Sequence, residues 1–246
     1  MNLKHIIIGS AALLIFIYFL FFSGGSPIFN RDEVPIKSIA YNVTKIMGYT
    51  VYVKEGNSFE PYLVLTNKYN GYTLLLRKNI LGSGRFNNYS SYYPGSTIDK
   101  SLNNGLIHVF SEELQNKIIN TEITVTAKQS IGVDGEATEH INRKIFLLSA
   151  TELGLNSGIA TVEGKRLQYF FYAKRRIAMS NGQPSSWWLR SSYNDNDSSA
   201  WGIGPDGTAG GGGTDASNGI RPAFCVDGNT IIQKSVMGWK SVYILR

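Results

Sequence analysis

The sequence predicts an α+β domain made of many short antiparallel strands, a few short helices and long loops. Short runs of β-branched and aromatic residues alternate with turn-forming residues, which is typical of an antiparallel meander. Serines followed by acidic residues mark the starts of short helices. A long polar stretch rich in Gly, Asn, Asp and Ser lies between two apolar-aromatic runs, SWWLRS and GIRPAF. Together these observations predict one globular domain over residues 39–246.

Size and charge limit the classes of function. The chain has 246 residues, a hydrophobic content of 43% and a formal net charge of +6. Its basic residues are scattered, and Lys174 to Arg176 form the only tight cluster. Because nucleic-acid interfaces need a concentrated basic surface, we expect no nucleic-acid partner.

Residues 6–22 form an uncharged apolar run whose length suits a membrane-spanning helix. Lys4 precedes this run and the first acidic residues follow it, which places the rest of the chain outside the cytoplasm. We therefore expect a single-pass anchor at residues 1–22 and a Pro/Gly-containing linker at residues 23–38. Cleavage near Ser23, followed by secretion, is the alternative.

The local patterns predict the elements in order. Strands are expected at residues 49–53, 61–66, 72–77, 122–127, 144–148 and 239–245. Short helices are expected at residues 96–104 and 111–119, the second with Ser111 as N-cap. Ser149 and Glu152 form a capping-box pattern that predicts a third helix. Gly210 to Gly213 lack the features of a phosphate-binding loop and are expected to form a flexible loop tip.

The polar stretch is the expected binding surface, and its flanks are the expected rigid frame. The frame residues are Trp187, Trp188, Arg190, Trp201, Arg221 and Phe224. We expect Arg190 and Arg221 to bridge to carboxylates or backbone carbonyls rather than to bind an anionic ligand. Aromatic residues mixed with Ser, Gly and Asn are typical of adaptable binding surfaces. The expected ligand contacts are Tyr193, Asn194, Asp195, Asn196, Asp197, Asp206, Thr208 and Asp215.

A series of segments carries a family resemblance. The order YLVLTN, YTLLLRKNIL, IDKSLNN, FSEELQNKI, KIFLLSATELG, KRIAMSNG, WWLRSS and NGIRPAF resembles a bacterial and phage domain of unknown function with a WWLRSP…GVRPAF signature. Ser192 and Ile220 stand where that signature has proline and valine. The resemblance implies a C-type-lectin-like fold, akin to phage tropism determinants and to proteins diversified by retroelements.

If a retroelement diversifies the polar stretch, certain residue types should be missing from it. Mutation of adenines in Asn codons cannot produce codons for Lys, Glu, Gln, Met or Trp. Residues 192–219 contain none of these types except Trp201, which we assign to the frame. The alternative is that any turn-rich loop favours Gly, Asn, Asp and Ser.

The sequence shows no pattern typical of a catalytic site or a metal site. The single cysteine, Cys225, lies in an apolar run and is expected to be a buried small side chain. The three histidines are far apart, and no catalytic motif is present, so we expect neither an enzyme nor a metal site. Asp195, Asp197 and Ser199 have the spacing of calcium ligands, but Ala200 stands where the loop needs glycine. No cofactor is therefore expected, with calcium as the alternative.

The sequence predicts a membrane-anchored, extracytoplasmic module that displays a loop surface to a protein or glycan. Two other functions stay open. One is a structural or receptor-binding component of a phage or surface assembly. The other is an enzyme related to formylglycine-generating oxidases, although these need reactive cysteines and Cys225 stands alone in an apolar run.

Overall fold

The protein is mostly β. The computed structural model describes residues 33–44, 49–155, 160–193 and 195–246, and one compact unit runs from Val34 to Arg246. Strands make up 44% and helices 16% of the described residues, and two of the sheets contain parallel pairs. The expected α+β class, with its C-type-lectin-like architecture of antiparallel strands, is therefore wrong.

The predicted membrane segment is not part of the described structure. Residues 6–22 lie outside the described residues. Among the residues that are described, no helix is both long enough and apolar enough to cross a membrane.

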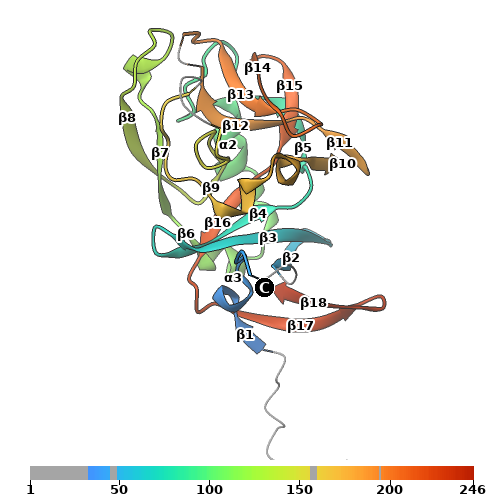
Figure 1. The fold of residues 1–246 in the computed structure, drawn as a ribbon. Helices are drawn as coiled ribbons and strands as arrows, with labels where there is room; N and C mark the ends of the chain where they lie inside the picture. The colour runs from blue at the N-terminus through green and yellow to red at the C-terminus, as the bar shows by residue number, and fades with distance from the viewer. Residues whose placement is uncertain (1–32, 45–48, 156–159, 194) are drawn as a thin grey trace, which may run out of the picture. The chain divides into compact units, whose positions relative to one another are not determined.

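A nine-stranded mixed sheet forms one end of the unit (Figure 1). Its strands, in spatial order, are β1 (Glu33–Pro35), β17 (Ile231–Met237), β18 (Lys240–Leu245), β2 (Thr50–Glu55), β3 (Ser58–Tyr69), β4 (Tyr72–Arg77), β16 (Ala223–Val226) and β6 (Ile118–Ile119), with β9 (Ile145–Phe146) also paired to β16. The pair β18–β2 is parallel. Between β3 and β4, Asn70 and Gly71 both have positive φ, as a tight hairpin turn requires.

A five-stranded mixed sheet forms the other end, and it contains most of the stretch expected to be a loop (Figure 1). Its order is β14 (Ala209–Gly213), β13 (Ser199–Ile203), β12 (Trp187–Ser192), β15 (Ser217–Ile220) and β5 (Gly82–Arg85). The central strand β12 is buried along its whole length. The polar stretch is thus three strands joined by short turns, not one long loop.

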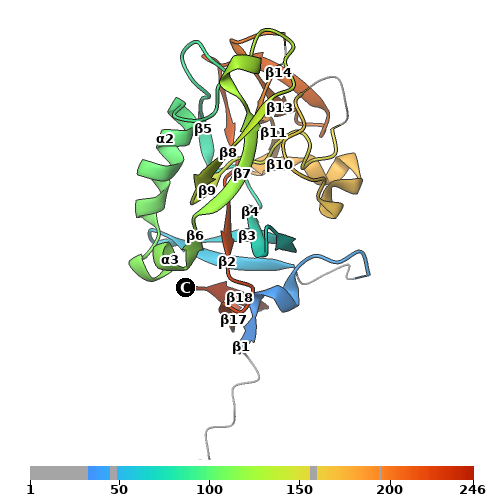
Figure 2. The same cartoon turned by 90° about the vertical axis from the view of Figure 1, so that its left-hand side faces the viewer.

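Two hairpins and a few short helices cover these sheets (Figure 2). The hairpins are β7 (Thr121–Thr126) with β8 (Thr138–Arg143), and β10 (Ala178–Ser180) with β11 (Gln183–Ser185). The α-helices are α2 (Thr97–Asn104) and α3 (Glu112–Lys117), and the 3-10 helices are Ile36–Ile39, Leu106–Val109, Lys128–Ser130, Gln168–Phe171 and Ala173–Arg176. Ser96 and Ser111 cap the two α-helices through their side-chain oxygens, which confirms the N-cap predicted at Ser111.

The third predicted helix does not form. The capping box itself is present: Ser149 N donates to Glu152 Oε2 (2.9 Å), and Glu152 N donates to Ser149 Oγ (3.1 Å). It closes a turn instead of opening a helix, because Gly154, with a φ of +67°, ends the turn two residues after Glu152 and Leu155 N donates back to the carbonyl of Ala150.

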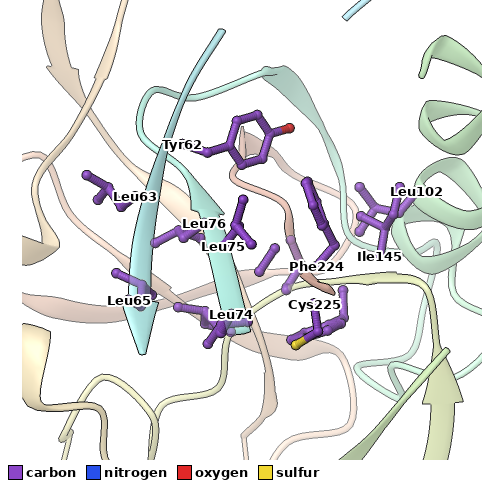
Figure 3. Packing of buried hydrophobic residues seen from close by; sticks show 14 of the residues in the cluster. Tyr62, Leu63, Leu65, Leu74, Leu75, Leu76, Leu102, Ile145, Phe224 and Cys225 are labelled. Atoms are coloured by element: carbon purple, nitrogen blue, oxygen red, sulfur yellow. The ribbon is translucent and has the colours of Figure 1, made fainter. Parts of the chain in front are cut away.

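The core between the elements is continuous (Figure 3). Phe224 on β16 packs against Tyr62 of β3, with ring centroids 5.3 Å apart. Leu102 of α2 and Ile145 of β9 close the far side of the same cluster. Cys225 is fully buried there, as expected from its apolar run. This core fixes β16, which follows directly after the segment Ile220 to Pro222 that leaves the five-stranded sheet.

Candidate functional site

The two tryptophans of β12 hold the five-stranded sheet from its two faces. The indole Nε1 of Trp187 donates to the carbonyl of Arg176 (3.0 Å), and that of Trp188 donates to the carbonyl of Gly84 on β5 (2.9 Å). Trp188 also meets Phe86 edge-on, with centroids 5.8 Å apart. Both indoles are buried with their polar atom satisfied, so β12 is a rigid support.

Arg190, on the same strand, is fully buried, and its guanidinium is fully hydrogen-bonded. Its guanidinium binds both carboxylate oxygens of Glu152 (2.8 and 2.9 Å), and it donates to the carbonyls of Thr124 and Leu147. Burial lowers the pKa of Arg190, but the charges of Glu152, Tyr69 and Glu163 and the hydrogen bonds to Glu152 together outweigh burial and raise that pKa. These contacts tie β12 to β7 and to the turn at Ser149, and they leave the guanidinium no donor for a ligand.

Arg221 is buried too, but it lies in a different environment. Its Nε donates to the carbonyl of Arg77 (2.9 Å), and its guanidinium lies 4.8 Å from the centroid of the Trp187 ring. Among the described residues it has no carboxylate partner, and Nη1 makes no hydrogen bond. Burial lowers the pKa of Arg221 to about 10. The two frame arginines are therefore not equivalent, since only Arg190 sits in an ion pair.

Tyr193 connects the frame to the turns. Its ring is stacked on that of Trp201, with centroids 4.0 Å apart and an angle of 9° between the planes. It also lies across Gly211, where a Cβ atom would be 2.0 Å from Cε2 of Tyr193. On the next residue, a Cβ at Gly212 would lie 3.1 Å from the ring of Trp188. The run of glycines is thus the strand β14 with aromatic rings over it, and the loop tip predicted from its composition is wrong.

The turn after β12 and the turn after β14 lie at the same end of the five-stranded sheet. Thr214 N donates to the carbonyl of Ser198 (2.8 Å) and joins the two turns. Ser91 N donates to the carbonyl of Asp197 (2.6 Å), and Asn87 N donates to the carbonyl of Thr214 (2.9 Å). We call this end, made by residues 193, 195–198 and 214–216 with the adjoining loop 87–92, the turn surface.

Most of the predicted contact residues lie on the turn surface. Asp195, Asn196, Asp197 and Asp215 are all exposed, and Tyr193 is half-buried at its edge. The amide oxygen of Asn196 accepts from Ser198 N and Oγ (2.8 and 2.9 Å), so this side chain shapes its own turn. Asn194 lies outside the described residues.

The other two predicted contacts are at the opposite end of the sheet. Asp206 and Thr208 form the turn between β13 and β14, beyond the pair Ile203 and Ala209. Asp206 Oδ1 accepts from Thr208 N (3.0 Å) and Thr208 Oγ1 (2.6 Å), and these bonds lower the pKa of Asp206. The sequence predicted all eight residues on one surface, but the antiparallel path of the chain places the seven described ones at two opposite ends of the sheet.

Two other loops contribute to the turn surface and were not predicted to do so. Tyr89, in the loop 87–92, has 84% of its surface exposed. The loop after β7 approaches as well, since a Cβ at Gly132 would lie 3.2 Å from that of Asp197. Asp134 and Glu136 of that loop are exposed. The Asn, Ser and Tyr content of loop 87–92 was the available signal, because it matches the predicted surface in composition.

The chemistry of the turn surface is acidic and aromatic. In the described part of the chain, the carboxylates of Asp195, Asp197 and Asp215 accept no hydrogen bond and join no ion pair. Burial, and then the charge of Asp195, raise the pKa of Tyr193. No group of three or more His, Cys, Asp or Glu residues that could hold a metal ion occurs among the described residues.

Comparison with known proteins identifies a family but no function. A family model described as a domain of unknown function, DUF6273, matches residues 70–228, which is more than half of the chain. No curated protein matches the chain. No solved structure matches it either.

Proposed function

Because the chain belongs to the DUF6273 family, whose description assigns no activity, we propose its function from the geometry: it is a non-catalytic module that binds a protein or a glycan through the turn surface. One observation carries this proposal. The carboxylates of Asp195, Asp197 and Asp215 are exposed on one surface, and within the described structure they accept no hydrogen bond and form no ion pair. Charged groups that do nothing for the fold are available to a partner.

The rigidity of the support favours binding over a purely structural role. The turns are joined by backbone hydrogen bonds and rest on a strand whose tryptophans and arginine are buried. A surface held in this way loses little conformational entropy on binding. The free carboxylates and the exposed ring of Tyr89 favour a ligand that carries basic groups and an apolar face.

Retroelement diversification is compatible with the positions of these residues. Asp195, Asn196, Asp197 and Asp215 lie on turns, where side chains can change without disturbing the core. Trp201, the exception to the codon pattern, is buried in β13. A reverse-transcriptase gene and a near-copy of the coding segment beside this gene would support diversification, and a neighbourhood without either would contradict it.

The absence of enzymatic activity is part of the same proposal. Burial raises the pKa of Cys225 to about 12, so that this thiol is protonated and inaccessible near neutral pH. An enzyme of the formylglycine-generating type would need a reactive cysteine. The second candidate function is that of a component of a phage or surface assembly, which the turn surface also suits. Subcellular fractionation distinguishes such a component from a membrane-anchored receptor.

Export and attachment through residues 6–22 stay a prediction. Protease treatment of intact cells tests it, because an exported domain is degraded while a cytoplasmic one is protected.

The binding proposal is tested with matched amide variants. The full-length chain is screened against immobilised glycans and a library of displayed proteins, and each binder is then measured against two variants. D195N/D197N/D215N removes the free carboxylates of the turn surface, and E112Q/E113Q/E122Q removes the same number of charges elsewhere. We expect the first variant to lose affinity and to keep its thermal stability, and the second to keep its affinity. The second variant also loses the ion pair of Glu113 with Lys117, so its binding is measured well below its own unfolding temperature. A binder whose affinity does not change in the first variant would refute the proposal.

A further inference from the structure

A cleft of about 930 Å³ lies beside the hairpin of β3 and β4 and shares no lining residue with the turn surface. Three stretches of chain line most of it, from Lys37 to Thr44, from Leu65 to Asn70 and from Val162 to Gln168. Small-ligand pockets typically have volumes of roughly 300–1,000 Å³. The cleft is therefore large enough for a ligand of several rings.

The floor of the cleft is rigid and carries no free negative charge. Tyr69 donates from its hydroxyl to Glu152 Oε1 (2.6 Å), and Arg190 binds both oxygens of the same carboxylate. Gly164, with a φ of +94°, closes over this pair, and a Cβ there would lie 3.2 Å from Glu152 Oε1. The negative charge of Glu152 is thus already paired with Arg190 when no ligand is bound.

The walls of the cleft are basic. Lys37, Lys68, Lys165 and Arg166 line it, and none of them forms an ion pair with a carboxylate of the described residues. The guanidinium of Arg166 lies 5.4 Å from the Phe171 ring centroid. It also crosses Gly154, where a Cβ would be 2.4 Å from Arg166 Nε. Packing therefore holds Arg166 in place.

The positive charge is not neutralised by its surroundings. Burial, and then the charge of Arg166, lower the pKa of the neighbouring Arg176. Among the described residues that line the cleft, Glu152 is the only one with a carboxylate, and Arg190 already matches it. An anion in the cleft would form charge-assisted hydrogen bonds that the protein alone does not provide.

Neutral groups beside these cations identify the class of ligand. The side-chain amides of Asn67 and Gln168 are exposed and form no hydrogen bond with other described residues, while Tyr41 and Tyr69 present half-buried rings. Amides can both donate to and accept from hydroxyl groups, and aromatic rings pack on apolar ring faces. We propose that this cleft binds an anionic oligosaccharide bearing carboxylate or sulfate groups, at a second site that is independent of the turn surface.

Other polyanions fit the cleft less well. A specific nucleic-acid interface buries about 1,000–2,500 Å² of protein surface, which is an extended surface and not a cleft. Binding to an anionic bilayer needs a row of apolar side chains to insert. Among the described lining residues, only Val43 and Val162 are exposed and apolar.

The test uses the full-length chain in detergent micelles and isothermal titration with defined sugars. The probes are trigalacturonate and a heparin-derived tetrasaccharide, with maltotriose as the neutral counterpart. K68E/K165E reverses two charges in the cleft, and K54E/K78E makes the same change in net charge outside it. We expect an anionic sugar to bind, sodium chloride to weaken that binding, and maltotriose to bind far more weakly.

The variants then locate the site. K68E/K165E should weaken binding by about tenfold or more, which corresponds to about 1.4 kcal/mol, whereas K54E/K78E should change it by less than about twofold. N67A/Q168A should weaken binding without altering its salt dependence, because it removes hydrogen bonds and no charge. The proposal is overturned if neither anionic sugar binds, or if both charge reversals weaken binding equally. It is also overturned if single-stranded DNA or phosphatidylglycerol vesicles bind more tightly than both sugars and lose that binding in K68E/K165E.

Discussion

Tyr193 and Trp201 stack face to face, with ring centroids 4.0 Å apart and 9° between the planes. Tyr193 directly follows β12, the central strand of the five-stranded sheet, and Trp201 lies on the neighbouring strand β13. Gly211, which pairs with Trp201 across the sheet, leaves room for the tyrosine ring. This stack anchors the beginning of the turn that carries Asp195 to Asp197, so the position of the turn surface depends on a glycine.

Gly211→Ala should therefore destabilise the domain. Its Cβ would lie 2.0 Å from Tyr193 Cε2, so the ring or the strand must move. We expect a loss of about 1–3 kcal/mol in the free energy of unfolding, measured by urea denaturation. Gly210→Ala is the matched control, because no atom lies within 4 Å of a Cβ at that position. Equal stability of the two variants would contradict the role assigned to Gly211.

The two frame arginines should respond differently to replacement by methionine. Arg190→Met leaves Glu152 buried without its cation, and we expect a loss of about 3–5 kcal/mol. Arg221→Met removes a buried guanidinium that has no ion pair and one unpartnered nitrogen, so its cost should be clearly smaller. Thermal and urea unfolding measure both variants. A greater loss in Arg221→Met would contradict this interpretation.

Glu163 should make stability fall as pH rises. Burial raises its pKa above the usual 4.5, although the charge of Arg190 and hydrogen bonds from Ser191 and Thr126 oppose the shift. Between the unfolded and folded pKa values the native state binds more protons than the unfolded state. The stability that depends on this proton is present below about pH 4.5 and is lost as pH rises through the folded pKa.

Comparison with Glu163→Gln isolates this effect. The variant keeps an acceptor oxygen for Thr126 and leaves the pair of Arg190 with Glu152 unchanged. Urea unfolding of both proteins from pH 4.5 to 8 should show a smaller decline in the variant. Parallel profiles would show that Glu163 does not titrate differently in the two states.

Cys225 should react with thiol reagents only when the protein unfolds. It is fully buried, and burial raises its pKa to about 12. At pH 8 we expect labelling by a disulfide reagent to be very slow in the native protein and complete in urea. Cys225→Ala should keep every binding activity of the wild type. Rapid native labelling, or loss of an enzymatic activity in that variant, would favour the catalytic alternative.

The sequence alone determined the strongest local features. The runs at residues 72–77 and 122–127 correspond to β4 and β7, and Ser111 caps a helix, because β-rich runs and capping residues act over a few positions. The burial of the Trp187 to Ser192 run also followed from its composition. The exposure of the aspartates followed from their type, since unpaired carboxylates are not stable in a core.

Only the tertiary structure decided which of these residues meet. Gly210 to Gly213 have no side chain to indicate a strand, and they form one because they pair with β13, while the rings of Tyr193 and Trp188 lie over Gly211 and Gly212. The carboxylate of Glu152 is buried, and the cation that pairs with it, Arg190, comes from far away in the sequence. The antiparallel return of β13 separates Asp206 from Asp197, and the parallel pair of β18 with β2 joins the two ends of the chain segment from Thr50 to Leu245. Such contacts depend on distances through space, which local sequence patterns do not contain.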